Sequence, residues 1–149
     1  KKFNFTILVS THPRLKEKLI NNKSILDKNI ILSRPFGYYE YLSLQKSSLL
    51  VISDSGSITE ESAILKFPAI SLRNDIERQE GMDEAIVVMS DLETNNVTNS
   101  IDILLKTQSH NFPSNLKDYS SQNVSDKVVR IITSYISFIN RRVWMKKNS

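Results

Sequence analysis

The chain has 149 residues, 40% of them hydrophobic and 24% charged, which is the composition of an ordinary globular domain. The absence of cysteine excludes disulfides and thiolate metal sites, and no apolar run reaches the roughly 18 residues of a membrane span. The net charge of +4 comes from the four basic residues of the tail 141–149, which argues against a nucleic-acid surface spread over the molecule. The chain begins at Lys1 without a secretory signal, and we expect a cytoplasmic fragment of a longer protein.

Strand and helix patterns alternate along the chain. In chain order, we predict a buried strand over 3–9, a helix over 15–20, a strand over 30–32, a helix over 38–46, a strand over 49–52, a helix over 58–65, strands over 69–72 and 86–89, and helices over 92–105 and 124–144. Residues 107–122 are polar and form a predicted linker. Such alternation is typical of βαβ units, so we expect an α/β fold with a parallel sheet and helices on both faces.

Polar residues follow each of the first four predicted strands. They are His12 and Arg14, residues 34–37, residues 54–57 and residues 73–78. In open parallel sheets, ligands bind at the carboxyl ends of the strands. These positions are therefore the candidate site.

Ser55-Gly56-Ser57 lies immediately before a predicted helix. The unpaired N–H groups and the positive dipole end of a helix start suit a phosphate. Of Glu60 and Glu61 in the first turn, one suits the dipole and the other a ribose diol. Simple capping explains the same residues, with either serine as N-cap and Glu60 as its partner. The residues alone leave binding and capping open.

Arg78 and His12 are two further candidates, each with an alternative interpretation. Arg78 lies in the charged segment 73–84, which is either a solvated loop or, at this edge, a source of an anion contact. His12 beside Arg14 can donate to a phosphate or act as an acid, although a lone histidine is more often structural.

Tyr38, Tyr39 and Tyr41 share a predicted helix and could stack on a base such as uracil, or form part of the core. His12 and His110 have no carboxylates at ligand spacing, so no metal site is predicted, and His110 is given no role. Neither a Walker loop nor G-x-G-x-x-G occurs, so we expect a nucleotide held without magnesium that is not NAD.

Asp54-Ser55-Gly56, Glu60-Glu61, Arg73 and Glu77-Arg78 together resemble the signature of the non-hydrolysing UDP-N-acetylglucosamine 2-epimerases. That signature reads D-S-G-G-x-x-E-E followed by R-x-x-T-E-R-P-E. The run from Ser10 to Arg14 is similar to the histidine motif of this family. The resemblance covers nearly the whole chain.

The resemblance implies an architecture. Family members have two Rossmann-like domains in the glycosyltransferase-B arrangement, with the active site between them. Residues 1–149 resemble the carboxyl-terminal, UDP-binding domain, with 124–149 as the terminal helix that packs across the amino-terminal domain. The resemblance implies that the full-length protein is a homodimer. It also implies that the protein needs no cofactor and binds neither nucleic acid nor membrane.

The resemblance also implies roles for individual residues. Ser55 and Gly56 hold the diphosphate, Glu61 the ribose, and Tyr41 lies near the uracil; Arg78 and the catalytic His12 approach the diphosphate. The general acid and base belong to the absent amino-terminal domain. We therefore expect the fragment to bind UDP weakly and to be inactive.

The implied reaction inverts C2 of a UDP-2-acetamido sugar by elimination and re-addition of UDP. Residues 80–85, 119–130 and 140–144 resemble a subgroup that converts UDP-2-acetamido-2,6-dideoxy-L-talose to UDP-N-acetyl-L-fucosamine for capsule or O-antigen sugars. Two departures from the family pattern are Ser57 in place of glycine and Gln79 in place of proline. Ser57 is compatible with the fucosamine subgroup, whereas Gln79 loosens the turn after Arg78.

Several alternatives remain. The first is the enzyme that makes UDP-N-acetylmannosamine from UDP-N-acetylglucosamine. Others are the donor-binding half of a glycosyltransferase with the same two-domain arrangement and a nucleotide-sensing module without catalysis. The last alternative is an interaction domain that needs no ligand. It gives the poorest explanation of why the candidate residues cluster at strand ends.

Overall fold

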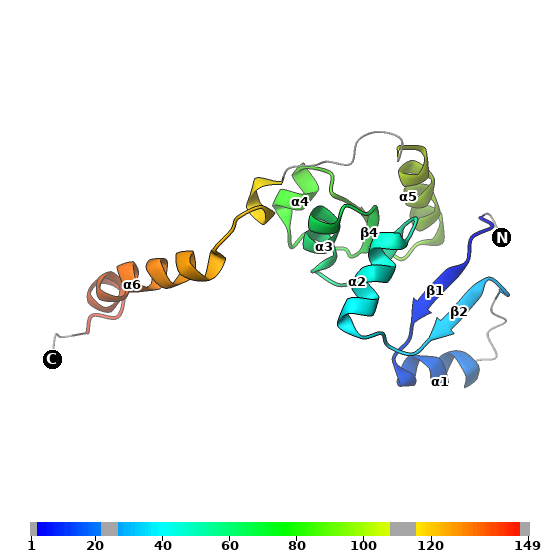
Figure 1. Cartoon of the computed structure of the whole chain (residues 1–149), viewed down its shortest axis with the longest axis horizontal. Helices are drawn as coiled ribbons and strands as arrows, with labels where there is room; N and C mark the ends of the chain where they lie inside the picture. Colours follow the sequence, from blue (N-terminus) through cyan, green and yellow to red (C-terminus); the bar gives the residue numbers. More distant parts are fainter. Residues whose placement is uncertain (1–2, 22–26, 108–115, 147–149) are drawn as a thin grey trace. The chain divides into compact units, whose positions relative to one another are not determined.

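The computed structural model describes residues 3–21, 27–107 and 116–146. It divides into two compact units, Lys1–Leu49 and Leu50–Ser149. Both units are built from parallel strands joined by helices (Figure 1). His110, for which no role is predicted, lies outside the described residues.

The first unit is a single βαβ arrangement followed by a helix. Its elements are β1 (Ile7–Ser10), α1 (Pro13–Asn21), β2 (Ile30–Ser33) and α2 (Tyr38–Ser47). The two strands are parallel, with Ile7 opposite Ile30. Beyond β1, the backbone N–H and the hydroxyl of Thr11 both donate to the carbonyl of Ser33, at 3.0 and 2.7 Å. These bonds fix the start of the turn that carries His12.

The predicted buried strand over 3–9 is wrong in its length and its burial. The strand starts at Ile7, which is 52% exposed, and the rings of Phe3 and Phe5 stack with their centroids 6.0 Å apart. Within the described part of the chain, β1 has β2 as its only hydrogen-bonded strand. A strand paired on one side in a two-stranded sheet is shielded less than an inner strand, which explains the exposure.

The second unit contains a three-stranded parallel sheet in the order β3-β4-β5. Its elements are β3 (Val51–Ser53), α3 (Ile58–Leu65), β4 (Ala69–Leu72), α4 (Gln79–Asp83), β5 (Val87–Ser90), α5 (Thr94–Thr107), the 3-10 turn η1 (Lys117–Tyr119) and α6 (Val124–Arg142). Figure 1 shows α3 and α5 on either side of β4. The ladders thus form two sheets, one in each unit, where the alternation alone predicts one.

The core of the second unit lies between α3 and the sheet. It contains Ile58, Ala63, Phe67, Ala69, Ile86, Val87 and Leu116. The hydroxyl of the buried Ser62 donates to the carbonyl of Phe67 at 2.6 Å, and Lys66 ends α3 in the left-handed region at φ 63°. The chain is thereby turned directly from α3 into β4, and the carboxyl ends of β3 and β4 lie at one edge.

The short helix α4 is absent from the sequence prediction, because its charged residues are typical of a solvated loop. The structure shows that this segment packs closely on α3. Gly81 is buried, and a Cβ built there would collide with Thr59 Cγ2 of α3. Only a residue without a side chain allows this close approach. Helix α4 is therefore held against the start of α3.

The terminal helix α6 presents its apolar side chains to solvent. The six residues of the predicted stripe are Val128, Ile131, Ile132, Tyr135, Ile136 and Ile139; the first five are exposed and Ile139 is half-buried. The predicted helix to residue 144 ends at Arg142. In the part of the chain that the structure describes, no helix combines the length and the apolar character that a bilayer crossing requires.

Candidate functional site

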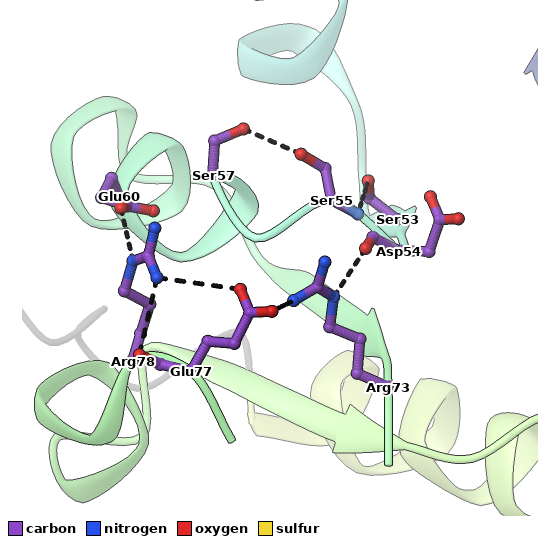
Figure 2. Close-up of polar contacts among 8 residues, drawn as sticks. All are labelled: Ser53, Asp54, Ser55, Ser57, Glu60, Arg73, Glu77 and Arg78. Carbon is purple, nitrogen blue, oxygen red and sulfur yellow. Dashed lines mark hydrogen bonds and ion pairs between the residues drawn. The ribbon is translucent and has the colours of Figure 1, made fainter. Parts of the chain in front are cut away.

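The turn from β3 into α3 is closed by serine side chains (Figure 2). Ser53 Oγ accepts from the backbone N–H of Ser55 at 3.1 Å, and the hydroxyls of Ser55 and Ser57 lie 3.0 Å apart. Ser57 Oγ donates to Glu61 Oε1 at 2.8 Å. Ser57 occupies the N-cap position of α3, as one of the two capping alternatives predicts, but it has helical φ and ψ and its side chain makes no capping hydrogen bond.

The two acidic residues of α3 point in different directions, as residues one position apart on a helix must. Glu60 Oε1 accepts from Arg78 Nε at 2.7 Å, and its other oxygen is buried with no hydrogen-bond partner among the described residues. Glu60 is thus engaged with Arg78, whereas Glu61 is bonded to Ser57 at the turn.

Arg73 is the guanidinium nearest to the turn. It follows β4, whose neighbour in the sheet is β3, and its Nε donates to the carbonyl of Asp54 at 2.7 Å. Its Nη1 lies 3.6 Å from the position that a Cβ on Gly56 would take. The sequence placed Arg73 in a motif without a role, yet the parallel pairing brings it onto the predicted phosphate turn.

Glu77 lies between the two arginines at this edge. Its Oε1 forms an ion pair with Arg73 Nη1, and its Oε2 is 3.7 Å from Arg78 Nη1. A Cβ on Gly56 would come within 2.7 Å of Glu77 Oε2, so this carboxylate lies directly over the glycine. Figure 2 shows it between the two guanidinium groups.

Arg78 is held by two carboxylates. The hydrogen bond and charge of Glu60, followed by the charge of Glu77, raise the pKa of Arg78 above its ordinary value. This guanidinium stays charged at any accessible pH, so it contributes a permanent positive charge. If Arg78 contacts a phosphate as predicted, the phosphate must share this guanidinium with Glu60 and Glu77.

A small hollow lies beside this network. Its lining includes Gly56, Thr59, Ser71, Arg73 and Met89. Its volume is about 20 Å³, which is room for a water molecule and not for a nucleotide. A nucleotide bound to this unit therefore cannot lie inside the hollow.

Tyr119 of η1 is joined to the same region. Its hydroxyl donates to Glu80 Oε1 at 2.6 Å, and this bond lowers the pKa of Glu80. Burial, and then the bond to Glu80, raise the pKa of Tyr119. The contact fixes η1, and with it the chain leading to α6, on α4.

His12 and Tyr41 belong to the first unit, whereas Ser55, Glu61 and Arg78 belong to the second. His12 is exposed in the turn after β1, where its Nδ1 accepts from the backbone N–H of Arg14 at 3.4 Å. Tyr41 is half-buried in α2, as is Glu61 in α3. The structure brings the predicted residues of the second unit together, and the binding or catalytic role of every predicted site residue, in both units, stays a prediction.

Comparison with known proteins identifies the family. The family profile described as UDP-N-acetylglucosamine 2-epimerase matches residues 1–133. The chain belongs to this family. It is 34% identical over 114 residues to the UDP-N-acetylglucosamine 2-epimerase of Methanococcus maripaludis, a match that covers 74% of this chain and 31% of the relative. The enzyme of Methanocaldococcus jannaschii is 31% identical over 136 residues, which is 88% of this chain and 36% of that protein.

Solved structures of the same family resemble this chain. A UDP-N-acetylglucosamine 2-epimerase from Rickettsia bellii superposes with a TM-score of 0.83 at 35% identity, covering 97% of this chain and 40% of that one. The M. jannaschii enzyme in complex with UDP-GlcNAc and UDP gives a TM-score of 0.70 at 30% identity, covering 87% of this chain and 36% of that one. These likenesses confirm the predicted α/β class within the glycosyltransferase-B fold. The chain spans about a third of the length of the curated relatives it matches.

Proposed function

We propose that this chain is the UDP-binding part of a UDP-sugar 2-epimerase that inverts C2 of a UDP-2-acetamido sugar. One observation carries the proposal: the Ser55–Gly56 turn at the start of α3 has an anchored guanidinium, Arg73, directly beside it. A helix start with a fixed cation and a close-approach glycine suits a diphosphate. A related enzyme, from M. jannaschii, was solved with UDP-GlcNAc and UDP.

The proposed roles follow from the positions of the side chains. Ser55 and Gly56 bind the diphosphate, and Glu61, bonded through one oxygen to Ser57, accepts a ribose hydroxyl with its carboxylate. Arg78, anchored on Glu60, adds positive charge at the turn. For Tyr41 near the uracil and His12 at the diphosphate, the support is the family resemblance.

The chemistry needs tight control of the leaving group. C2 of the sugar bears a proton with no carbonyl beside it, so direct removal is slow. Elimination of UDP across C1 and C2, with return of the proton on the other face and re-addition of UDP, avoids this problem. Negative charge grows on the diphosphate as the C1–O bond breaks, and fixed donors and cations at the turn stabilise that charge.

The rest of the reaction is proposed to lie outside this chain. The relatives are about three times as long, which leaves room for an amino-terminal domain that carries the general acid and base. The exposed apolar stripe of α6 suits packing against that domain. We propose that the fragment alone binds UDP weakly and is inactive, and that the full-length protein is a cytoplasmic homodimer.

Two substrates remain for the proposed enzyme. The resemblance of residues 80–85, 119–130 and 140–144 to the fucosamine subgroup favours UDP-2-acetamido-2,6-dideoxy-L-talose and a role in capsule or O-antigen synthesis. The names of the relatives favour UDP-N-acetylglucosamine. Both sugars carry the same UDP, so the turn itself does not discriminate between them.

The test is to incubate the full-length protein with each UDP-sugar in D₂O and follow the sugar by NMR. The expected result is inversion at C2 with deuterium uptake there, for one of the two sugars. Transfer to an added acceptor sugar, without C2 inversion, would instead identify a glycosyltransferase. A UDP-sugar that is bound and left unchanged would identify a nucleotide-sensing protein.

A further inference from the structure

Arg73 and Arg78 are held in the same way. Each uses Nε to bond a fixed acceptor, the carbonyl of Asp54 for Arg73 and the carboxylate of Glu60 for Arg78, both at 2.7 Å. Each turns Nη1 toward Glu77 (Figure 2). The two guanidinium groups are therefore oriented independently of Glu77 and converge on one position over the α3 turn.

We propose that Glu77 is an internal competitor for the diphosphate, whose carboxylate must leave this position when UDP binds there. This inference rests on the proposed function. A carboxylate over Gly56, between two cations and at the start of an eight-residue helix, has the surroundings that a phosphate group requires. Both anions cannot occupy that place.

The side chain that moves is identified by exposure and anchoring. The side chain of Glu77 is 49% exposed, whereas that of Arg73 is 29% exposed. Among the described residues, the ion pairs of Glu77 are with these two arginines alone. Glu77 can therefore swing into water without burying a charge, while Arg73 stays fixed on Asp54.

The consequence is a limit on affinity. The free energy gained from the diphosphate is reduced by the ion pairs that Glu77 gives up. In a reaction that must hold UDP during catalysis and then release a UDP-sugar, a returning carboxylate helps to expel the product. Glu77 is thus a positioning residue that sets the affinity of the turn.

The test compares Glu77→Gln with the wild-type full-length protein by calorimetry with UDP, pyrophosphate and uridine. The expected result is binding of UDP and pyrophosphate about two- to tenfold tighter in Glu77→Gln, the strength of one or two partly exposed ion pairs, with uridine binding unchanged. Glu84→Gln is the matched control, because Glu84 is an exposed acid at the end of α4 and its loss changes net charge equally. It should leave all three affinities near the wild-type values.

Weaker or equal UDP binding by Glu77→Gln, when the wild-type protein binds UDP, would overturn the role of Glu77 and leave the proposed function intact. Failure of both proteins to bind UDP would overturn both proposals. Thermal melting shows whether Glu77→Gln is folded. If it is not, Glu77→Asp withdraws the carboxylate by one methylene, and unchanged or weaker UDP binding by that variant contradicts the inference.

Discussion

The side chains at the β3–α3 turn have partners within the chain, whereas the apolar side chains of helix α6 are exposed to solvent. At the turn, Arg73, Glu77 and Arg78 are paired with one another or with nearby groups, so the geometry of the site is fixed within one unit. On α6, apolar residues such as Ile136, which is 51% exposed, meet solvent. The difference teaches that the edge where we propose the diphosphate to bind is built within one unit, whereas the exposed apolar side chains of α6 fit the proposal that this helix packs against another domain.

The largest expected effect is on the core that supports the turn. Phe67 is 1% exposed, so Phe67→Ala should lower the free energy of unfolding by about 3–5 kcal/mol. Ile136→Ala on α6 is the matched control and should change it by less than about 0.5 kcal/mol in this chain. Urea denaturation of both variants measures the contrast. Equal losses would show that the α6 residue is packed as well as the core.

The contact between α3 and α4 should be the next most sensitive. Gly81→Ala places a methyl group against the buried, β-branched Thr59, which should cost about 1–3 kcal/mol. Adding Thr59→Ser removes the opposing methyl group and should recover part of the loss. Thermal melts of the single and double variants test this. A loss of stability in the double variant that exceeds the sum of the two single losses would refute the explanation.

Glu61 of α3 should contribute to UDP binding, unlike an acidic residue away from the turn. Glu61→Ala should weaken UDP binding by about 1–3 kcal/mol, because a ribose hydroxyl loses its acceptor. The exposed Glu84 gives the control, and Glu84→Ala should bind as the wild type does. Calorimetry on the full-length protein measures both. An unchanged affinity in Glu61→Ala would restrict Glu61 to its bond with Ser57.

The smallest effect expected concerns the bond that joins η1 to α4. Tyr119→Phe removes the donor that lowers the pKa of Glu80, and the melting temperature should fall slightly at neutral pH. The contribution of Glu80 is present above its unfolded pKa of about 4.5 and is lost as the pH falls through the lower folded value. The difference between wild type and variant should therefore shrink in acid. A constant difference from pH 7 to pH 3 would contradict this.

The sequence predicted much of the fold, because its strands and helices have clear periodicity. Helix α3 and strand β4 are confirmed at the predicted residues, and the other strands shift by a few positions. The short α4 was missed, because its charged residues are typical of a solvated loop and its packing against α3, through Gly81 and Thr59, joins positions distant in sequence. Burial of β1 was predicted from its apolar residues alone, and burial depends on partners that a single segment does not reveal.

The candidate site was predicted in part. Placing Ser55, Gly56 and Arg78 near one edge followed from the rule that ligands bind at strand ends. The difference between Glu60, which pairs with Arg78, and Glu61, which bonds to Ser57, is visible only in the structure. The positions of Arg73 and Glu77 needed the pairing of β3 with β4. A signal was present in the sequence, because Arg73 directly follows β4.

The most direct test of the central claim is a crystal structure of the full-length protein with UDP. The account predicts the diphosphate over Gly56, in contact with Arg73 and the start of α3, with the ribose at Glu61. A diphosphate bound away from this turn, with the Ser55–Ser57 segment unoccupied, would contradict it.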